Sequence, residues 1–133
     1  MITKNIKDEL VQKAVKIRQN AYAPYSKYFV GAALLTSSGS VYLGVNVENA
    51  VYSATVCAER VAILKAVSEG EYEFQALAVA TENGGSPCGF CRQVLAEFGL
   101  DTIVLIADGD GNLVEETTVG ELLPIAFTPK DLE

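Results

Sequence analysis

The fold predicted for this chain depends on two stretches, TVCAER at residues 55–60 and SPCGFCRQ at residues 86–93. Together they contain all three cysteines of the 133-residue chain. Each stretch precedes a run of residues with helical character, so we expect each to begin a helix. Free N–H groups and the helix dipole favour negative charge at such positions, and thiolates are stabilised there. The cysteines are therefore expected to act as thiolates at two helix starts.

The segments around these stretches alternate between helix-like and strand-like patterns. Asn5 is the expected N-cap of the first helix and Thr55 that of the second. The runs at 74–81 and 102–107 are almost continuously apolar, which is typical of a sheet covered on both faces. The expected helices are 5–22, 57–68, 88–98 and a short one at 118–123, and the expected strands are 29–35, 41–47, 74–81, 102–107 and 113–117.

These elements predict an α/β fold, a three-layer helix–sheet–helix domain with a mixed five-stranded sheet, in which residues 1–133 form a single domain. The turn-rich residues 36–40 predict an antiparallel hairpin between the first two strands. Both cysteine-bearing stretches lie in connections between a strand and a helix. We expect the two helix starts to converge at the ends of neighbouring parallel strands.

The spacing of the cysteines indicates a metal site. Cys88 and Cys91 are three positions apart, so they can bind one metal from a single helical turn. Cys57 would complete a set of three protein ligands, and catalytic zinc characteristically keeps its fourth position for water. Glu59 lies in the same first turn as Cys57, so its carboxylate can reach that position as a general acid and base.

The charge of such a site requires support from its surroundings. Three thiolates on Zn²⁺ leave one net negative charge, which makes the metal a poor Lewis acid. Arg60 and Arg92 each adjoin a ligand segment and could donate hydrogen bonds to the thiolates. An ordinary surface position for both arginines remains the alternative.

Other interpretations of these residues compete. A redox dithiol at Cys88 and Cys91 would leave the segment 57–59 unexplained. A closed structural zinc site would need a fourth Cys or His, and the chain has no histidine. Cys57 could also be an inert core thiol. Asn46 and Glu48 share one face of a strand and could grip a pair of hydroxyls, or simply face solvent.

Composition excludes several classes of partner and location. The net charge is −7, and no lysine or arginine cluster offers the positive surface that nucleic acid needs. No apolar run approaches the roughly 18 residues of a membrane span. The charged N-terminus has no apolar segment behind it, so we expect a soluble cytoplasmic protein.

The segments 57–59 and 87–91 resemble the signature of zinc nucleoside deaminases. More narrowly, the chain is similar to the small homotetrameric cytidine deaminases over nearly its whole length. The segments that carry this similarity are 23–26, 30–34, 44–50, 57–60, 87–89, 91–93 and 121–124, together with Phe127.

The resemblance implies zinc-dependent hydrolytic deamination of free cytidine and 2′-deoxycytidine to uridine and 2′-deoxyuridine, with release of ammonia, in pyrimidine salvage. It implies one Zn²⁺ per subunit and a nucleoside as the small-molecule substrate. The implied roles are zinc binding by Cys57, Cys88 and Cys91, proton transfer by Glu59, ribose binding by Asn46 and Glu48, pyrimidine carbonyl binding by the backbone of Ala58, a base-pocket wall at Tyr28, and subunit contacts at Tyr52 and Phe127, the latter reaching a neighbour's ligand.

Some positions depart from the family pattern. Tyr28 stands where the family usually has Phe. Phe29 and Phe90 are larger than the residues usual at their positions and enlarge side chains near the site, which bears on the shape of the pocket and not on the zinc chemistry. Two alternatives remain for the function. Blasticidin-type deaminases resemble this chain but lack the Asn-x-Glu-Asn segment present at 46–49. A zinc-stabilised interaction module would have a closed metal site and no turnover.

Overall fold

The computed structural model describes residues 2–133, which form one mixed sheet with helices on both faces. The helices and strands follow the predicted order closely. They are α1 (Lys4–Ile17), β1 (Gly31–Thr36), β2 (Val41–Val45), α2 (Ala58–Ser68), β3 (Phe74–Ala80), α3 (Gly89–Glu97), β4 (Ile103–Ala107), β5 (Leu113–Thr118) and α4 (Val119–Leu122), with 3-10 turns at Arg18–Asn20, Tyr52–Ala54 and Pro129–Leu132.

The sheet confirms the predicted mixed five-stranded architecture. It corrects the expectation of which strands are neighbours. The strand order is β2-β1-β3-β4-β5, with β3 and β4 parallel and the other neighbours antiparallel. The expectation that both helix starts follow neighbouring parallel strands is wrong, because β1 lies between β2 and β3. The predicted hairpin of β1 and β2 is present.

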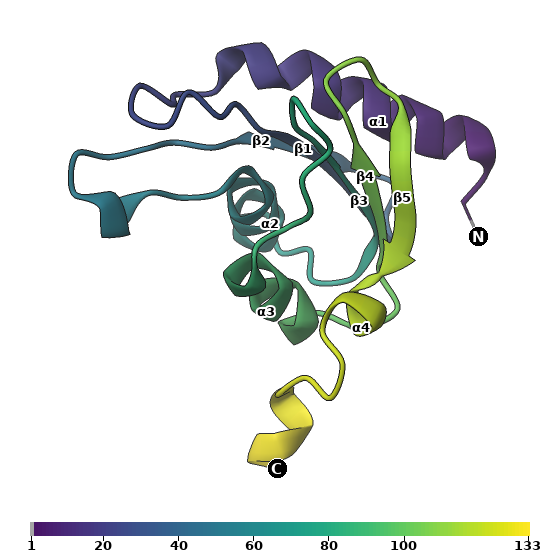
Figure 1. The fold of residues 1–133 in the computed structure, drawn as a ribbon. Coiled ribbons are helices and arrows are strands. Elements are labelled where there is room, and N and C mark those ends of the chain that lie inside the picture. Colours follow the sequence, from purple (N-terminus) through teal and green to yellow (C-terminus); the bar gives the residue numbers. More distant parts are fainter. Residues whose placement is uncertain (1) are drawn as a thin grey trace.

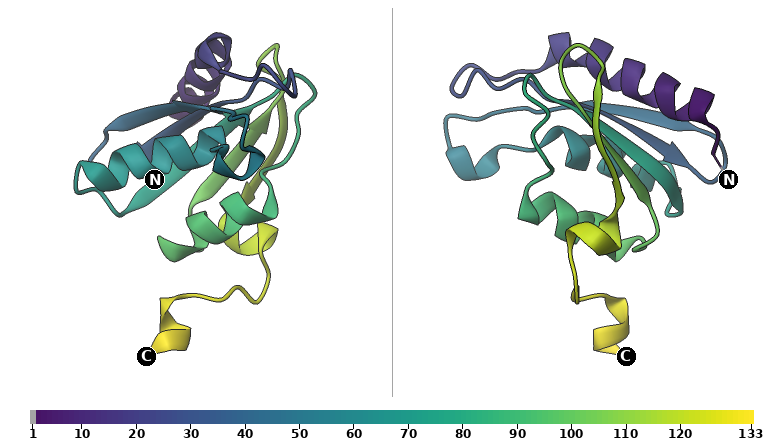
Figure 2. Two further views of the ribbon diagram at one scale, coloured as in Figure 1. Left: turned by 90° about the vertical axis from the view of Figure 1, so that its left-hand side faces the viewer. Right: turned by 45° about the vertical axis from the view of Figure 1, so that its right-hand side comes forward.

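The sheet is the middle of three layers, as predicted. α1 covers one face, and α2 and α3 cover the other (Figure 1; Figure 2). Strand β1 shows why both faces need a cover: Ala32 and Leu34 join the cluster under α2 and α3, whereas Ala33 and Leu35 join the cluster under α1. Alternate residues of a strand point to opposite faces, so this strand is buried throughout.

The ends of the first two helices differ from the prediction. Thr3, not Asn5, caps α1, since its side chain accepts a hydrogen bond from the backbone N–H of Ile6 at 3.2 Å. Regular α-helix then ends at Ile17. Cys57, not Thr55, is the N-cap residue of α2. The hydroxyl of Thr55 instead accepts a hydrogen bond from the backbone N–H of Asn49 in the preceding loop.

Gly44 in β2 lets the first turns of α2 approach the sheet closely. A Cβ at this position would lie 2.4 Å from the carbonyl oxygen of Ala58 and 2.6 Å from the backbone nitrogen of Ala62. Those distances are far below van der Waals contact, so only glycine fits. The close approach fixes the position of the segment that carries Cys57 and Glu59.

The C-terminal segment leaves the body of the molecule after α4 and projects away from the sheet (Figure 1; Figure 2). The Gln93 side chain on α3 donates a hydrogen bond to the backbone oxygen of Phe127 in this segment, at 2.8 Å. Phe127 is 57% exposed. Among residues 2–133, no helix has the length and apolar character to cross a membrane.

Candidate metal centre and substrate cavity

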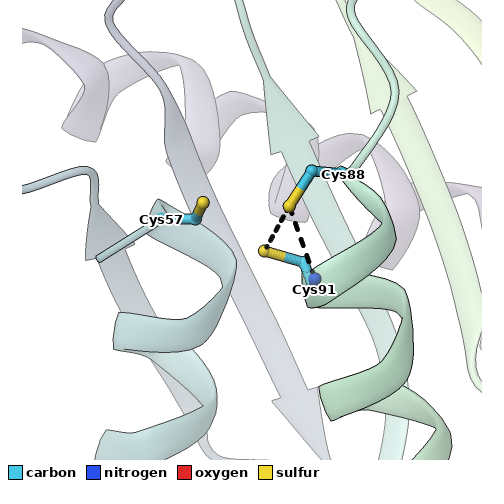
Figure 3. Close-up of side chains that lie close together, drawn as sticks. All are labelled: Cys57, Cys88 and Cys91. Carbon is cyan, nitrogen blue, oxygen red and sulfur yellow. Dashed lines mark hydrogen bonds between the residues drawn. The ribbon is translucent and has the colours of Figure 1, made fainter. Parts of the chain in front are cut away.

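The three cysteines meet between the starts of α2 and α3. Cys57 is the N-cap of α2, and Cys88 is the N-cap of α3, where its Sγ accepts a hydrogen bond from the backbone N–H of Cys91 at 3.4 Å. All three Sγ atoms lie within 4.8 Å of one another. In Figure 3 the sulfur atoms of Cys88 and Cys91 point toward the side on which Cys57 lies.

This donor set fits zinc. Tetrahedral Zn²⁺ with Zn–S bonds of about 2.3 Å would hold its sulfur ligands about 3.8 Å apart. The Cys88 and Cys91 Sγ atoms are 3.5 Å apart, and the Cys57 Sγ lies within 4.8 Å of both. No fourth Cys, His, Asp or Glu joins this cluster among the described residues. The arrangement is therefore that of a three-sulfur site with one free position.

Arg60 makes the hydrogen bond to a cysteine sulfur that the sequence suggested. Its Nη2 donates a hydrogen bond to Cys57 Sγ at 3.3 Å. The Cys91 thiol, together with this guanidinium, holds the pKa of Cys57 below its usual range. The pKa of Cys91 is raised by the neighbouring Cys57, by burial and by the Glu59 carboxylate. Negative charge is thus best accommodated on Cys57.

Arg92 does not make the bond to a thiolate that its position suggested. Its guanidinium donates to three oxygens: the backbone carbonyls of Pro87 and Leu122, each at 2.8 Å, and the hydroxyl of Ser86 at 2.6 Å. Because Pro87 immediately precedes Cys88, the side chain holds the backbone that leads into the cluster. Arg92 therefore supports the loop and α4 rather than a sulfur.

Glu59 is a buried carboxyl group beside the cluster. Only 4% of the residue is exposed, although it lines the cavity described below. Burial raises the pKa of this carboxyl to about 7. A carboxyl with a pKa near neutrality can both accept and return a proton, which is what a general acid and base requires.

A cavity of about 270 Å³ opens beside the cluster. It brings together most of the residues that the sequence singled out, while Cys91, Phe127, Tyr52 and the two arginines lie outside its lining. Phe29 and Phe90, the two residues that are larger than usual for the family, are not among the lining residues. The lining residues are Ser26, Tyr28, Val30, Asn46, Glu48, Thr55, Cys57, Ala58, Glu59, Val79, Thr81, Gly85, Ser86 and Cys88.

Asn46 and Glu48 line the cavity and also hold the loop that forms its rim. Asn46 is 8% exposed, so the solvent-facing alternative is wrong for this residue. Its amide group accepts from the N–H of Val30 at 2.9 Å and donates to the carbonyl of Tyr28 at 2.8 Å. Glu48 accepts hydrogen bonds from both the backbone and the hydroxyl of Ser26.

Sequence reasoning assigned no part in the site to several lining residues. Ser26 and Thr55 line the cavity, and Thr81 accepts a hydrogen bond from the backbone N–H of Gly85 at 2.7 Å. Hydroxyl groups of this kind are common in loops, so their type alone carries no signal. Only the similarity of segment 23–26 to the resembled family pointed to one of them, Ser26.

Comparison with known proteins agrees with this geometry. A family model described as "Cytidine and deoxycytidylate deaminase zinc-binding region" matches residues 4–107. The chain belongs to this deaminase family. Its cofactor is therefore zinc, and the cysteine cluster is a group able to hold the ion.

Individual relatives of this deaminase support the same assignment. A cytidine deaminase of Sporosarcina psychrophila is 50% identical over 127 residues, covering 94% of this chain and 93% of that protein. A blasticidin-S deaminase of Bacillus cereus is 35% identical, with 90% and 91% covered. The crystal structure of a cytidine deaminase from Burkholderia pseudomallei superimposes with a TM-score of 0.85 at 43% identity, covering 95% of this chain and all of that one.

Proposed function

We propose that this deaminase converts free cytidine and 2′-deoxycytidine to uridine and 2′-deoxyuridine, with release of ammonia, as a step of pyrimidine salvage. The observation that carries the proposal is the position of Glu59. This buried carboxyl lines the same cavity as Cys57 and Cys88, beside a three-sulfur cluster with a free position. A proton carrier next to an open metal site suits hydrolysis rather than structural support.

In this proposal Cys57, Cys88 and Cys91 hold the zinc ion, one per subunit. Bound zinc supplies Lewis acidity, which makes a water molecule a nucleophile at neutral pH. The N–H of Cys91 and the guanidinium of Arg60 both donate to sulfur, so they offset part of the negative charge of three thiolates. The two helix starts contribute in the same direction.

Glu59 carries the protons of the reaction. It accepts a proton from the attacking water as the oxygen bonds to the amino-bearing ring carbon, and it gives a proton to the adjacent ring nitrogen. It then takes the remaining proton from the hydroxyl group that was added to this carbon and passes it to the amine as the carbon–nitrogen bond breaks. Water and cytidine thus yield uridine and ammonia. One carboxyl group can perform both transfers because its pKa, about 7, lies near neutral pH.

The remaining cavity residues orient the nucleoside. Asn46 and Glu48 bind the ribose hydroxyls, the backbone of Ala58 binds the pyrimidine carbonyl, and the ring of Tyr28 packs on the base. These assignments rest on the family resemblance and on the shared lining of one cavity. Tyr52 and Phe127 lie at subunit contacts of a homotetramer, and the enzyme works in the cytoplasm.

Blasticidin S is the second candidate substrate, favoured by the 35% identical relative. Two observations favour cytidine. The more similar Sporosarcina protein, at 50% identity, carries the name cytidine deaminase. The Asn-x-Glu-Asn segment at 46–49, which the resemblance links to ribose binding, is intact, and both Asn46 and Glu48 line the cavity.

The test is a turnover assay on purified zinc-loaded protein. Loss of cytidine ultraviolet absorbance and release of an equal amount of ammonia are expected, with one zinc per chain by metal analysis. Blasticidin S, tested in parallel, should react far more slowly. Bound zinc without turnover of either compound would favour the interaction module and overturn the proposal.

A further inference from the structure

Phe90 occupies an unusual position for a large apolar side chain. It lies between Cys88 and Cys91 in the first turn of α3, and 67% of the residue is exposed. It does not line the substrate cavity. Its aromatic ring instead lies under the guanidinium of Arg60, whose Cζ is 4.4 Å from the ring centroid. This distance is well within the range of a cation–π interaction.

Arg60 has few other contacts that could fix its orientation. Its Nη2 donates to Cys57 Sγ at 3.3 Å. Its Nε is buried and has no hydrogen-bond partner among the described residues. An arginine nitrogen usually finds an acceptor when it is buried, and here the aromatic face covers the group instead. The guanidinium thus lies between the Cys57 sulfur, with Cys91 close by, and the Phe90 ring.

The contact also joins the two halves of the metal centre. Arg60 belongs to α2, which begins at Cys57, and Phe90 belongs to α3, which begins at Cys88. The pair therefore spans the same gap between helix starts that the three sulfur atoms span. A charged group placed beside a thiolate and shielded from water by a ring acts more strongly on that thiolate than a solvated one.

We propose that Phe90 is a positioning residue of the zinc site: its ring holds the Arg60 guanidinium against the Cys57 sulfur, so that this arginine offsets the charge of the three thiolates. The inference rests on the zinc site of the proposed function. It accounts for an aromatic residue between two ligands, which the chemistry of the ligands alone does not require. Removing the ring frees the guanidinium and weakens the hold on zinc.

The test measures how fast zinc leaves the purified, zinc-loaded full chain when a chromogenic chelator is in excess. Phe90→Ala and Phe90→Leu should both release zinc about three- to tenfold faster, as expected for a lost cation–π contact acting through a group next to the ligands. Phe90→Tyr keeps a ring and should restore slow release. Leucine separates the aromatic effect from the loss of apolar bulk.

A double-mutant cycle decides whether Phe90 acts through Arg60. In the Arg60→Ala background, Phe90→Ala should cause no further acceleration. Phe29→Ala is the control, because Phe29 lies in a separate hollow with Val15, Arg18 and Gln19. Independent effects of the two changes, or slow release by Phe90→Leu, would overturn the proposal. The cycle reports on zinc even if the wild-type chain fails to turn over cytidine, so the two proposals fail separately.

Discussion

Glu59 combines burial with a catalytic position. Ala58, Ala62 and Ile63 on the same helix, α2, are buried with it, and the helix carries it to the wall of the cavity rather than to solvent. Burial disfavours the charged carboxylate, which is why its pKa rises to about 7. The site thus places a carboxyl that can change its protonation state near neutral pH directly beside the metal ligands.

Replacing this carboxyl by an amide should separate catalysis from structure. Glu59→Gln keeps the volume of the side chain but removes the proton carrier, so we expect kcat to fall by about 10²–10⁴-fold while zinc content is unchanged. Steady-state kinetics and metal analysis on the same preparation measure both. Glu97→Gln, which changes an exposed glutamate at the end of α3, is the control. A Glu59→Gln variant with most of its activity would refute the proton-transfer role.

Individual side chains show how far the sequence could predict the site. The pairing of Cys88 with Cys91 and of Cys57 with Glu59 was accessible because spacing within one helical turn fixes which residues lie together. The meeting of the two pairs depends on how α2 and α3 pack on the sheet. The two arginines have similar positions next to a ligand, yet Arg60 reaches a sulfur and Arg92 reaches the backbone of Leu122, thirty residues away. That choice depends on how α4 packs beside α3, which no local pattern encodes.

At the scale of elements, the position of α2 depends on Gly44. Gly44→Ala would place a methyl group against the backbone of Ala58 and Ala62, so α2 would have to move away from β2. We expect a loss of about 1–3 kcal/mol in the free energy of unfolding, as is typical of overpacking. Urea unfolding measures it. Gly89→Ala is the matched control, because a Cβ there meets no atom within 4 Å. Equal stabilities of the two variants would contradict the close-packing argument.

Two loops that form the cavity are tied to each other by one hydrogen bond. The Tyr28 hydroxyl donates to Oδ1 of Asn83 at 2.9 Å, joining the loop before β1 to the loop before α3. Tyr28→Phe keeps the ring but removes the tie, so we expect KM for cytidine to rise by up to about tenfold, the range of one net hydrogen bond, with a smaller change in kcat.

The same tie can be removed from its other end. Asn83→Ala should raise KM by a similar factor, and the double variant should behave like either single one, since all three lack the same bond. Additive effects in the double variant, or an unchanged KM in Tyr28→Phe, would show that the hydroxyl has no part in holding the cavity wall.

The elements themselves were largely predictable, since the apolar runs place the core strands within one or two residues. Helix α1 was predicted to continue to about Tyr22 because apolar residues recur as far as Ala21, but the chain tightens into a 3-10 turn at Arg18–Asn20. The strand order could not be predicted. A buried strand has the same pattern whether its neighbour is β1 or β4, so the insertion of β1 between β2 and β3 leaves no local signal.

At the scale of the whole molecule, we expect the free energy of unfolding to fall in acid because Glu71 becomes protonated. This carboxylate accepts hydrogen bonds from the hydroxyls of Ser38, Thr36 and Tyr42, which clamp the β1–β2 hairpin. These bonds, led by that of Ser38, lower its pKa from 4.5 to about 2. A lowered folded-state pKa stabilises the protein above the unfolded value, and this contribution disappears as the pH falls toward 2.

The comparison of wild type with Glu71→Gln isolates this contribution from other acid effects. Wild type should be the more stable protein above about pH 4.5, and the gap between the two should shrink steadily toward about pH 2. Urea unfolding at a series of pH values measures it. A gap that stays constant with pH would show that the carboxylate charge is not what the three hydroxyls stabilise.

We propose that the exposed aromatic residues Tyr52 and Phe127 lie at subunit contacts of a homotetramer. Tyr52 is 75% exposed, and Phe127 lies on a C-terminal segment that projects from the body (Figure 1). We expect sedimentation to show a tetramer of the 14.2 kDa chain. Phe127 would then complete the cavity of a neighbouring subunit, so Phe127→Ala should raise KM without loss of zinc.

Mixed tetramers test whether this aromatic residue acts across subunits. Glu59→Gln chains lack the proton carrier but still offer Phe127, whereas Phe127→Ala chains have an intact Glu59. The two variants are dissociated and reassembled together. If Phe127 serves a neighbour, some cavities then contain both Glu59 and Phe127, and the activity of the mixture should exceed the average of the two variants measured alone. If Phe127 serves only its own chain, mixing restores nothing, because no cavity then contains both residues.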